Sequence, residues 1–484
     1  MLEPKVWQLT AGSVVAGLAL AAVAVAVAGP WDSGQRKAER EWAAAQGRTG
    51  GAHHDPRAPR TPSPAPSAPE VLSVLTAQGA EPAELADLSA GLGKTLGPLL
   101  DDKALGKLRT ASVVDAATGK PLYGKAADTP MTPASTVKIA TMAAALSALG
   151  PDHRIATTVT ATRDAKTLTL VGGGDATLDR EGLRSLAEDT TRVLHDRGVT
   201  KVTLHYDASL YSGPRAHPIG PNDNIAPVDA LMAGQGRLDK STRGPAPRSG
   251  DPAGDAADLF AELLREEGIR TTAAPTAAKP AEPAGSAKPA RSARSAKSTA
   301  SAEVVAKTYS RPLSALVERA LTESDNDVAE SLARQTALAT GRPASFAGAE
   351  QAVRAQLEKL EVPLTGARFA DGSGLDRKDR ASAALLTALL ARAADPDHPE
   401  LRPVLTGLPV ARFSGTLRNR YQDAAPAAGL IRAKTGTLTG VNTLAGTAVD
   451  SRGRLLAFAF MAGSTSSPGE AQAVLDRLSA SLVR

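Results

Sequence analysis

The stretch TPASTVKIATMAAALSALG, residues 132–150, places Ser135 and Lys138 three positions apart at the start of an alanine-rich run. This run predicts a buried α-helix with Ser135 at its N-terminus. Because positions i and i+3 share one helix face, we expect the lysine amine and the serine hydroxyl within hydrogen-bond reach. A buried lysine that loses its proton is a base, and a helix N-terminus favours developing negative charge. The same residues also fit an ordinary helix start with an exposed lysine.

A second motif, Ser324-Asp325-Asn326, separates two predicted helices. An interruption of this kind can present the short polar side chains of Ser324 and Asn326 to a cleft. Asp325 is expected to be structural or to contact substrate. The alternative is a simple N-cap, because Ser, Asp and Asn are all preferred at helix starts.

A third motif, Lys434-Thr435-Gly436, ends an apolar predicted strand. A cation and a hydroxyl suit a carboxylate ligand, and the glycine leaves room for an extended peptide along the strand edge. The N–H of Thr437 can join that of Ser135 in an oxyanion hole. By itself this motif also fits a surface strand with a glycine turn. The three motifs together, in this order, favour one acyl-transfer site.

The composition excludes several other kinds of site. The chain of 484 residues contains no cysteine, which excludes disulfides, thiolate catalysis and cysteine-based zinc sites. Its seven histidines show no metal-ligand spacing, so we expect no metal and no other cofactor. The net charge of +5 is spread among interspersed acidic and basic residues, and aromatic residues make up only 3%. This pattern argues against nucleic-acid binding.

An uncharged apolar run near the N-terminus, residues 9–29, approaches the length of a membrane-spanning helix. It ends in Ala26-Val27-Ala28, which resembles a signal-peptidase site. We therefore predict a signal peptide or signal anchor over residues 1–30 and a location outside the cytoplasmic membrane. The enzyme would then be secreted or anchored in the cell envelope. Residues 31–79 are rich in proline and alanine and predict a disordered linker.

The order of strand and helix patterns predicts an α+β protein. Strand patterns occur near both ends of the chain with helices between them, which implies a sheet assembled from remote segments. We expect residues 80–150 and 311–484 to form two parts of one catalytic domain. Residues 151–310 are expected to form a smaller inserted mixed domain with a low-complexity loop at 275–303.

Together the motifs resemble those of class C low-molecular-mass penicillin-binding proteins, the serine D-Ala-D-Ala carboxypeptidase/endopeptidase family. The long spacing between Ser135 and Ser324 favours this family over β-lactamases, because extra domains are inserted there. The similarity runs from about residue 80 to the C-terminus. It implies a penicillin-binding/transpeptidase-like fold, with an antiparallel sheet flanked by helices and a helical subdomain. Further similar stretches are LVGGGDATL (170–178), ADGSGLDRKDR (370–380), LPVARFSGTLRNRY (408–421) and GLIRAKTGTLTGVNTLAGTAVD (429–450).

The resemblance assigns catalytic roles to residues of all three motifs. It implies that Ser135 is the acylated nucleophile, that Lys138 is its base and that Ser324 takes part in proton transfer. The backbone amides of Ser135 and Thr437 are expected to form the oxyanion hole. The residues expected to bind substrate are Asn326 and, for the terminal carboxylate, Lys434, Thr435 and Gly436.

The implied reaction is cleavage of D-Ala-D-Ala in peptidoglycan stem peptides through an acyl-enzyme. β-Lactam antibiotics are expected to act as covalent inhibitors that mimic the dipeptide, and the membrane is a further partner if the N-terminal segment is not cleaved. One alternative is a β-lactamase or esterase of the same fold, but no convincing Glu-x-x-Leu-Asn-like segment is present to position a deacylating water. Another alternative is a non-catalytic cell-wall scaffold.

Overall fold

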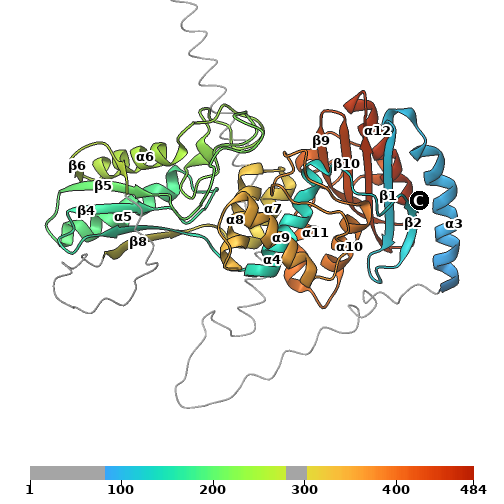
Figure 1. Cartoon of the computed structure of the whole chain (residues 1–484), viewed down its shortest axis with the longest axis horizontal. Coiled ribbons are helices and arrows are strands. Elements are labelled where there is room, and N and C mark those ends of the chain that lie inside the picture. The colour runs from blue at the N-terminus through green and yellow to red at the C-terminus, as the bar shows by residue number, and fades with distance from the viewer. Residues whose placement is uncertain (1–81, 279–301, 484) are drawn as a thin grey trace, which may run out of the picture. The chain divides into compact units, whose positions relative to one another are not determined.

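The computed structural model describes residues 82–278 and 302–483. Within these ranges the chain forms two separate β-sheets, each with its own helices (Figure 1). None of the helices in these ranges is long and apolar enough to cross a membrane. The predicted signal segment and linker lie outside the described residues, and so does most of the predicted low-complexity loop.

The first sheet is antiparallel and joins both ends of the described chain. Its strand order is β2-β1-β11-β10-β9, so strand β9 with the Lys434 motif lies at an edge. Strand β1 pairs with β11 over its whole length, from Leu108 opposite Gly463 to Asp115 opposite Leu456. The strands are β1 (Leu108–Asp115), β2 (Pro121–Lys125), β9 (Ile431–Leu438), β10 (Val441–Val449) and β11 (Leu455–Gly463).

A helical layer packs against one side of this sheet and shares one hydrophobic core with it. Helix α10 contacts β1, β10 and β11, and α4 packs between the other helices. Residues 138–146 of α4 are all buried, because its small alanine side chains let neighbouring helices approach closely. The helices are α4 (Lys138–Leu149), α7 (Leu313–Thr322), α8 (Asn326–Ala339), α9 (Phe346–Lys359), α10 (Ala383–Ala394) and the short α11 (Arg402–Thr406).

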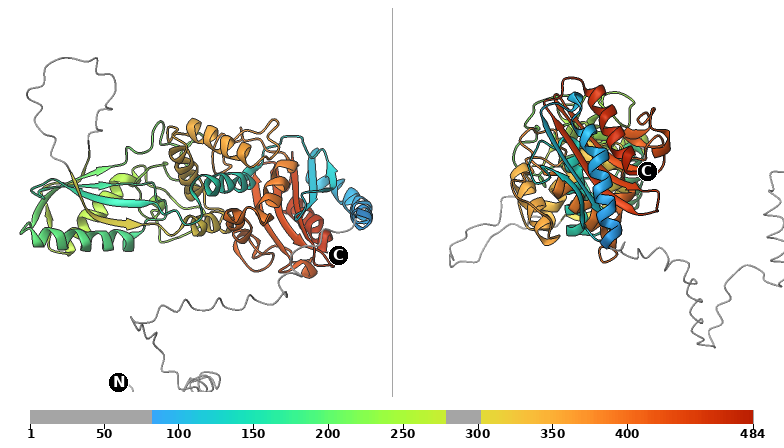
Figure 2. Two further views of the ribbon diagram at one scale, coloured as in Figure 1. Left: turned by 90° about the horizontal axis from the view of Figure 1, so that it is seen from below. Right: turned by 90° about the vertical axis from the view of Figure 1, so that its right-hand side faces the viewer.

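Two further helices, α3 (Pro82–Leu100) and α12 (Pro468–Ala480), lie beside each other and cover the opposite side (Figure 2). They bury leucines against Phe458 and Phe460 of β11, whose rings stack with centroids 5.3 Å apart. Because both faces of the sheet are covered, residues 441–448 of β10 are buried without the alternation of a half-exposed strand.

The second sheet is mixed and has its own hydrophobic core, which includes Leu170 and Phe260. Strand β3 is antiparallel to β4 and β8, whereas β4 and β5 are parallel and are joined by α5. The elements are β3 (Ala156–Ala161), β4 (Thr167–Val171), α5 (Arg180–Asp196), β5 (Lys201–Asp207), α6 (Pro252–Glu266), β6 (Arg270–Thr271), β7 (Thr276–Ala277) and β8 (Glu303–Tyr309).

The predicted α+β class is confirmed, including the antiparallel sheet flanked by helices. The second sheet falls within residues 151–310, where we predicted an inserted mixed domain, and the domain boundaries stay a prediction. A long segment between β5 and α6, residues 208–251, makes polar contacts with the start of α8. We call residues 208–251 the docking segment.

Candidate active site

The structure brings all three sequence motifs together around the Lys138 amine. Ser135 lies in a short 3-10 turn, Ala134–Val137, and Lys138 is the first residue of α4. The Lys138 Nζ atom donates to Ser135 Oγ at 3.2 Å and to Asn326 Oδ1 at 2.7 Å. It also donates to the Ser373 carbonyl oxygen at 2.6 Å. Lys138 is therefore held on three sides, with the serine hydroxyl as one of its partners.

The backbone before Ser135 is tightly held. Ala134 has a φ of 48°, a conformation that residues with a side chain rarely adopt without support from their surroundings. That support includes the Pro133 carbonyl, which accepts hydrogen bonds from Thr136 Oγ1 at 2.7 Å and Thr443 Oγ1 at 2.8 Å. A Cβ on Gly374 would lie 2.1 Å from the Ala134 carbonyl oxygen, so only glycine fits against this turn. The position of the serine therefore depends on β10 and on the loop that carries Gly374.

Burial sets the protonation of Lys138. The side chain is fully buried, which disfavours the ammonium form and lowers the pKa to about 8, although the nearby carboxylates of Asp371 and Glu330 oppose the shift. A lysine with this pKa is partly neutral near pH 7 and can accept a proton from a hydroxyl at hydrogen-bond distance.

A second buried lysine lies across the site. Lys434 Nζ donates to Ser324 Oγ at 2.9 Å and to the Thr435 carbonyl oxygen at 2.8 Å. Burial and the nearby Lys138 cation hold the Lys434 pKa well below its usual range. Ser324 itself has a φ of 58°, and strained backbone of this kind is often found at functional sites. The proton-transfer role expected of Ser324 stays a prediction, and the structure shows its hydroxyl bonded to Lys434.

Asp325 is the N-cap of α8, as the alternative interpretation proposed. Its carboxylate accepts the Val328 N–H at 3.0 Å, and its other oxygen accepts from Gln235 Nε2 at 2.6 Å and Arg319 Nε at 2.9 Å. A carboxylate with these partners holds the helix start in place. The neighbouring Asn326 is free to turn toward the lysine, so capping and site formation coexist.

The remaining predicted residues lie on the edge strand β9. Thr435 is half-buried, and its Oγ1 donates to Thr416 Oγ1 at 2.8 Å. A Cβ on Gly436 would meet Thr443 Oγ1 at 2.1 Å, so the glycine is needed for packing against β10. Thr437 is exposed and its Oγ1 accepts from Gln472 Nε2 of α12 at 3.3 Å. We predicted Gly436 for access by a peptide, and the structure adds a packing requirement.

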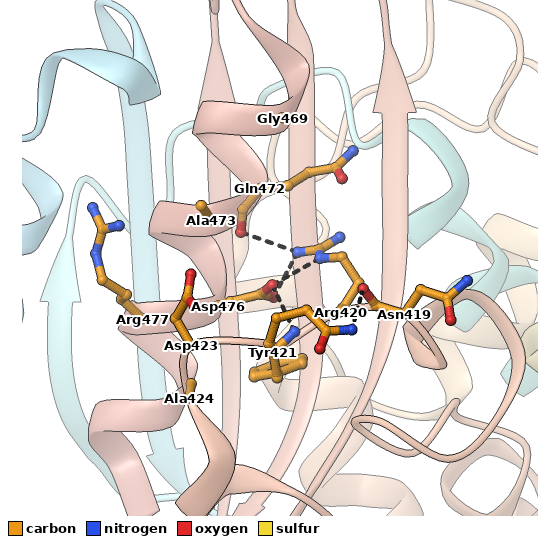
Figure 3. A pocket seen from close by; sticks show the side chains of 11 residues that line it. Asn419, Arg420, Tyr421, Asp423, Ala424, Gly469, Gln472, Ala473, Asp476 and Arg477 are labelled. Atoms are coloured by element: carbon orange, nitrogen blue, oxygen red, sulfur yellow. Dashed lines mark hydrogen bonds and ion pairs between the residues drawn. The ribbon is translucent and has the colours of Figure 1, made fainter.

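The loop carrying Thr416 is fixed to α12 by a bidentate ion pair (Figure 3). Arg420 Nε lies 2.9 Å and Nη2 lies 2.6 Å from the Asp476 carboxylate. This pair forms part of the wall of a cavity of about 210 Å³ that Asn419, Gln472 and their neighbours line. The three sequence motifs contribute no residue to this lining. The contact from Gln472 to Thr437 connects the cavity wall to β9.

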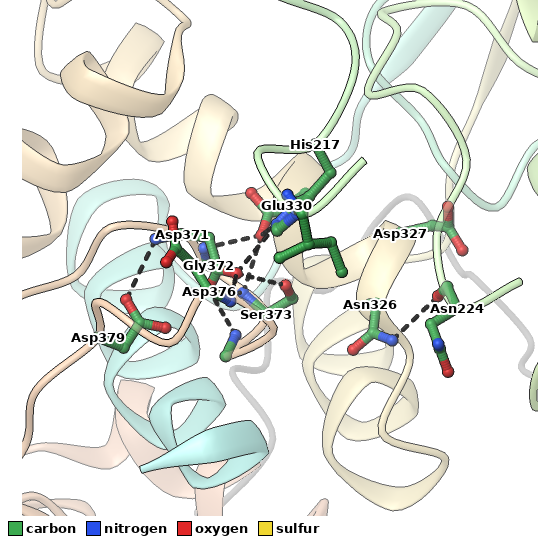
Figure 4. A network of polar contacts seen from close by, with 12 residues as sticks. His217, Asn224, Asn326, Asp327, Glu330, Asp371, Gly372, Ser373, Asp376 and Asp379 are labelled. Atoms are coloured by element: carbon green, nitrogen blue, oxygen red, sulfur yellow. Dashed lines mark hydrogen bonds and ion pairs between the residues drawn. The ribbon is translucent and has the colours of Figure 1, made fainter. Parts of the chain in front are cut away.

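A buried cluster of His217, Glu330, Asp371 and Asp379, shown in Figure 4, supplies charges that act on Lys138. His217 Nε2 lies 3.0 Å from Asp371 Oδ2 and 3.7 Å from Glu330 Oε1. Burial would lower the His217 pKa, but its contacts with Asp371 and Glu330 outweigh burial and raise the pKa to about 9. Burial favours the neutral form of Asp371. The hydrogen bonds of Asp371 with His217 and Asp379 nevertheless hold its pKa far below the usual range. Burial and the Asp371 charge raise the Asp379 pKa to about 11.

His217, Glu330 and Asp371 are also metal-ligand types, with one ligand atom each lying within 4.8 Å of the others. Their oxygens, however, already accept backbone N–H groups, and Arg334 Nη1 lies 4.0 Å from Glu330 Oε2. The cationic side chains of His217 and Arg334 thus already lie beside these two carboxyl groups. The residues therefore fit an internal ion-pair network, and we do not assign them to a metal.

Several site residues were not named from the sequence. Ser373 and Gly374 lie in ADGSGLDRKDR and Thr416 in LPVARFSGTLRNRY, two stretches that sequence reasoning had marked without assigning roles. No comparable sequence signal marks His217 or Asn224. The Asn224 carbonyl accepts from Asn326 Nδ2 at 3.0 Å and so orients the Asn326 amide oxygen toward Lys138.

The chain is similar to known proteins along most of its length. The sequence profile of the D-Ala-D-Ala carboxypeptidase 3 (S13) family matches residues 92–253 and 240–482. A carboxypeptidase of Mycobacterium tuberculosis is 36% identical over 400 residues, which cover 79% of this chain and 81% of that protein. Carboxypeptidase DacB of Mycolicibacterium smegmatis is 36% identical over 419 residues, which cover 82% of this chain and 86% of that protein. The crystal structure of penicillin-binding protein 4 of Haemophilus influenzae matches with a TM-score of 0.64 and 21% identity, covering 81% of this chain and 98% of that one.

Proposed function

The chain belongs to the D-Ala-D-Ala carboxypeptidase 3 (S13) family, and on this premise we propose that Ser135 is its acylated nucleophile and Lys138 its base. The resemblance predicted from the motifs is thereby confirmed, and the protein is a serine peptidase of the carboxypeptidase/endopeptidase type. The single observation that carries the residue assignment is the 3.2 Å contact between Lys138 Nζ and Ser135 Oγ in a buried site. Burial lowers the Lys138 pKa to about 8, which suits a general base.

The proposed acylation begins with Ser135 Oγ attacking the carbonyl carbon of the penultimate D-Ala. Lys138 takes the hydroxyl proton, and the N–H groups of Ser135 and Thr437 stabilise the oxyanion. The C–N bond then breaks, and the departing amine of D-Ala takes the proton that Lys138 accepted. We propose the Ser324 hydroxyl, which Lys434 holds at 2.9 Å, as the relay for this proton. Water subsequently hydrolyses the ester and regenerates Ser135.

We propose that β9 binds the substrate as an extended strand. An edge strand offers unpaired backbone groups with which such a peptide can pair. Thr435 Oγ1 and Thr416 Oγ1, 2.8 Å apart, present two hydroxyls for the terminal carboxylate. Lys434 is fully buried and bonded to Ser324, so its proposed contribution is to orient Ser324 and to supply nearby positive charge when protonated.

Action on peptidoglycan places the enzyme outside the cytoplasmic membrane. We propose that the apolar segment at residues 9–29 directs export, either as a cleaved signal or as a retained anchor. We also propose that residues 151–310 are a domain inserted into a catalytic domain formed by residues 80–150 and 311–484. Support for this division comes from the separate sheets and separate hydrophobic cores.

The test uses the purified full chain, a pentapeptide ending in D-Ala-D-Ala and a cross-linked muropeptide, with products identified by mass spectrometry. We expect D-Ala release or cross-link cleavage by the wild type and neither by Ser135→Ala. Ser147→Ala is the matched control, because Ser147 lies on α4, the helix that follows the Ser135 turn, but bonds to Gln356 at 3.1 Å, away from the site. Unchanged product formation by Ser135→Ala would overturn the nucleophile assignment. Rapid turnover of penicillin would favour the β-lactamase alternative.

A further inference from the structure

His217 reaches the site from a part of the chain that contains none of the three motifs. It belongs to the docking segment, between the second sheet and α6. Its side chain is buried, contacts Asp371 at 3.0 Å and packs edge-on against Phe346 with ring centroids 5.4 Å apart. A histidine inside a protein needs a partner for its polar ring atoms, and here that partner is the loop beside the proposed catalytic lysine.

The two carboxylates next to His217 determine the shape of that loop (Figure 4). Asp371 accepts the N–H groups of Ser373 at 3.0 Å and Gly374 at 2.5 Å. Glu330 Oε1 accepts the N–H groups of Gly372 at 2.9 Å and Ser373 at 3.0 Å. These bonds fix the backbone at Ser373, whose carbonyl oxygen accepts from Lys138 Nζ at 2.6 Å. The chain of contacts from His217 to Lys138 is therefore continuous.

We propose that His217 is a positioning residue for Lys138, holding Asp371 and Glu330 so that the Ser373 carbonyl meets the lysine amine. The inference rests on the proposed role of Lys138 as the base. It assigns to the docking segment a part in the reaction that requires no contact with substrate.

The charges around His217 predict the direction of its effect. The groups facing it are Asp371 and Glu330, with Arg334 beyond Glu330 and Asp379 beyond Asp371. The nearby carboxylates favour the ammonium form of Lys138. If a neutral side chain replaces the histidinium, one positive charge beside these carboxylates is lost. Their negative charge then stabilises the ammonium form more strongly, so the Lys138 pKa should rise. Glu330→Gln removes a negative charge while keeping an acceptor oxygen, so the pKa should fall.

The experiment measures the rate constant for acylation by a fluorescent penicillin between pH 5.5 and 9.5, using the purified full chain. For the wild type we expect the rate to rise with pH through a midpoint of about 8. His217→Gln should move the midpoint up by roughly one unit, which makes acylation about tenfold slower at pH 7. Glu330→Gln should move the midpoint down. A purely structural role would lower the rate equally at every pH.

The matched control is His205→Gln, because His205 lies in the second sheet and contacts Thr276 Oγ1 at 2.8 Å, away from Lys138. Its profile should superpose on that of the wild type. If His217→Gln does not fold, the midpoint of the Glu330→Gln profile decides. The proposal is overturned if that midpoint does not move down. Superposed profiles for His217→Gln and the wild type also overturn it, as does a loss of wild-type rate in EDTA that zinc restores. Failure of the wild type to react with penicillin would instead contradict the proposed function.

Discussion

Substituting Gly374 with alanine should disable the nucleophile while leaving most of the fold intact. Gly374 has a φ of 84°, and an alanine there would place its Cβ 2.1 Å from the Ala134 carbonyl oxygen and 2.9 Å from the Ser135 nitrogen. The left-handed conformation alone costs about 1–2 kcal/mol. The overlap must be relieved by moving the turn that carries Ser135 by roughly 1 Å, and a displacement of this size can reduce a rate about 100-fold. We therefore expect acylation by fluorescent penicillin to slow by at least about 100-fold.

The variant Gly453→Ala separates the effect of the left-handed backbone conformation from the effect of the steric overlap. Gly453 lies in the turn between β10 and β11 with a φ of 78°, but a Cβ there has no atom within 4 Å. This variant should lose about 1 kcal/mol of unfolding free energy and acylate at the wild-type rate. The assay is the time course of fluorescent labelling, with thermal unfolding measured on the same samples. A Gly374→Ala enzyme that acylates within threefold of the wild type would refute the argument that this contact sets the position of Ser135.

Two further predictions concern stability. Burial and the Asp371 charge raise the Asp379 pKa to about 11, so the native state keeps a proton that the unfolded chain releases above about pH 4. The contribution of Asp379 to stability therefore falls by about 1.4 kcal/mol per pH unit as pH rises. The side chain of Asp379→Asn cannot titrate, so the difference in unfolding free energy between this variant and the wild type, measured in urea, should shift in favour of the variant from pH 5 to pH 8. A difference that stays constant with pH would contradict the raised pKa of Asp379. Asp325→Ala should lose roughly 2 kcal/mol, because the cap on α8 is removed and the partners Gln235 and Arg319 are left unpaired. Asp325→Asn, which keeps a capping oxygen, should lose less in the same measurement, and equal losses would exclude the capping contribution.

Local sequence signals predicted most of the secondary structure near the site. Runs of apolar residues marked α4, α7, α8 and the strands near the C-terminus, because each element buries one side or both against a hydrophobic core. The interruption at residues 324–326 was also visible, since cap residues end and begin helices. These helices, strands and caps depend on a few neighbouring residues, so they can be predicted from one sequence.

Contacts between remote segments were not predictable in the same way. The resemblance implies a proton-transfer role for Ser324, but only the fold shows its Oγ atom 2.9 Å from Lys434 Nζ. It also gave no role to His217, because a lone histidine in an irregular segment has no spacing that marks its partners. Only the docking of that segment brings it to 3.0 Å from Asp371. The distance between two side chains on separate elements depends on how every intervening element packs.

The sequence by itself determined the reaction class and predicted the residues that carry it, because acyl transfer needs a serine, a nearby base and a carboxylate-binding strand, and each of these is a short local motif. The tertiary structure alone decided how these groups are held and charged. Lys138 and its three hydrogen-bond partners come from three separate parts of the chain, which only the fold brings together. Protonation follows from burial and from the sum of surrounding charges, and neither quantity exists before the chain has packed.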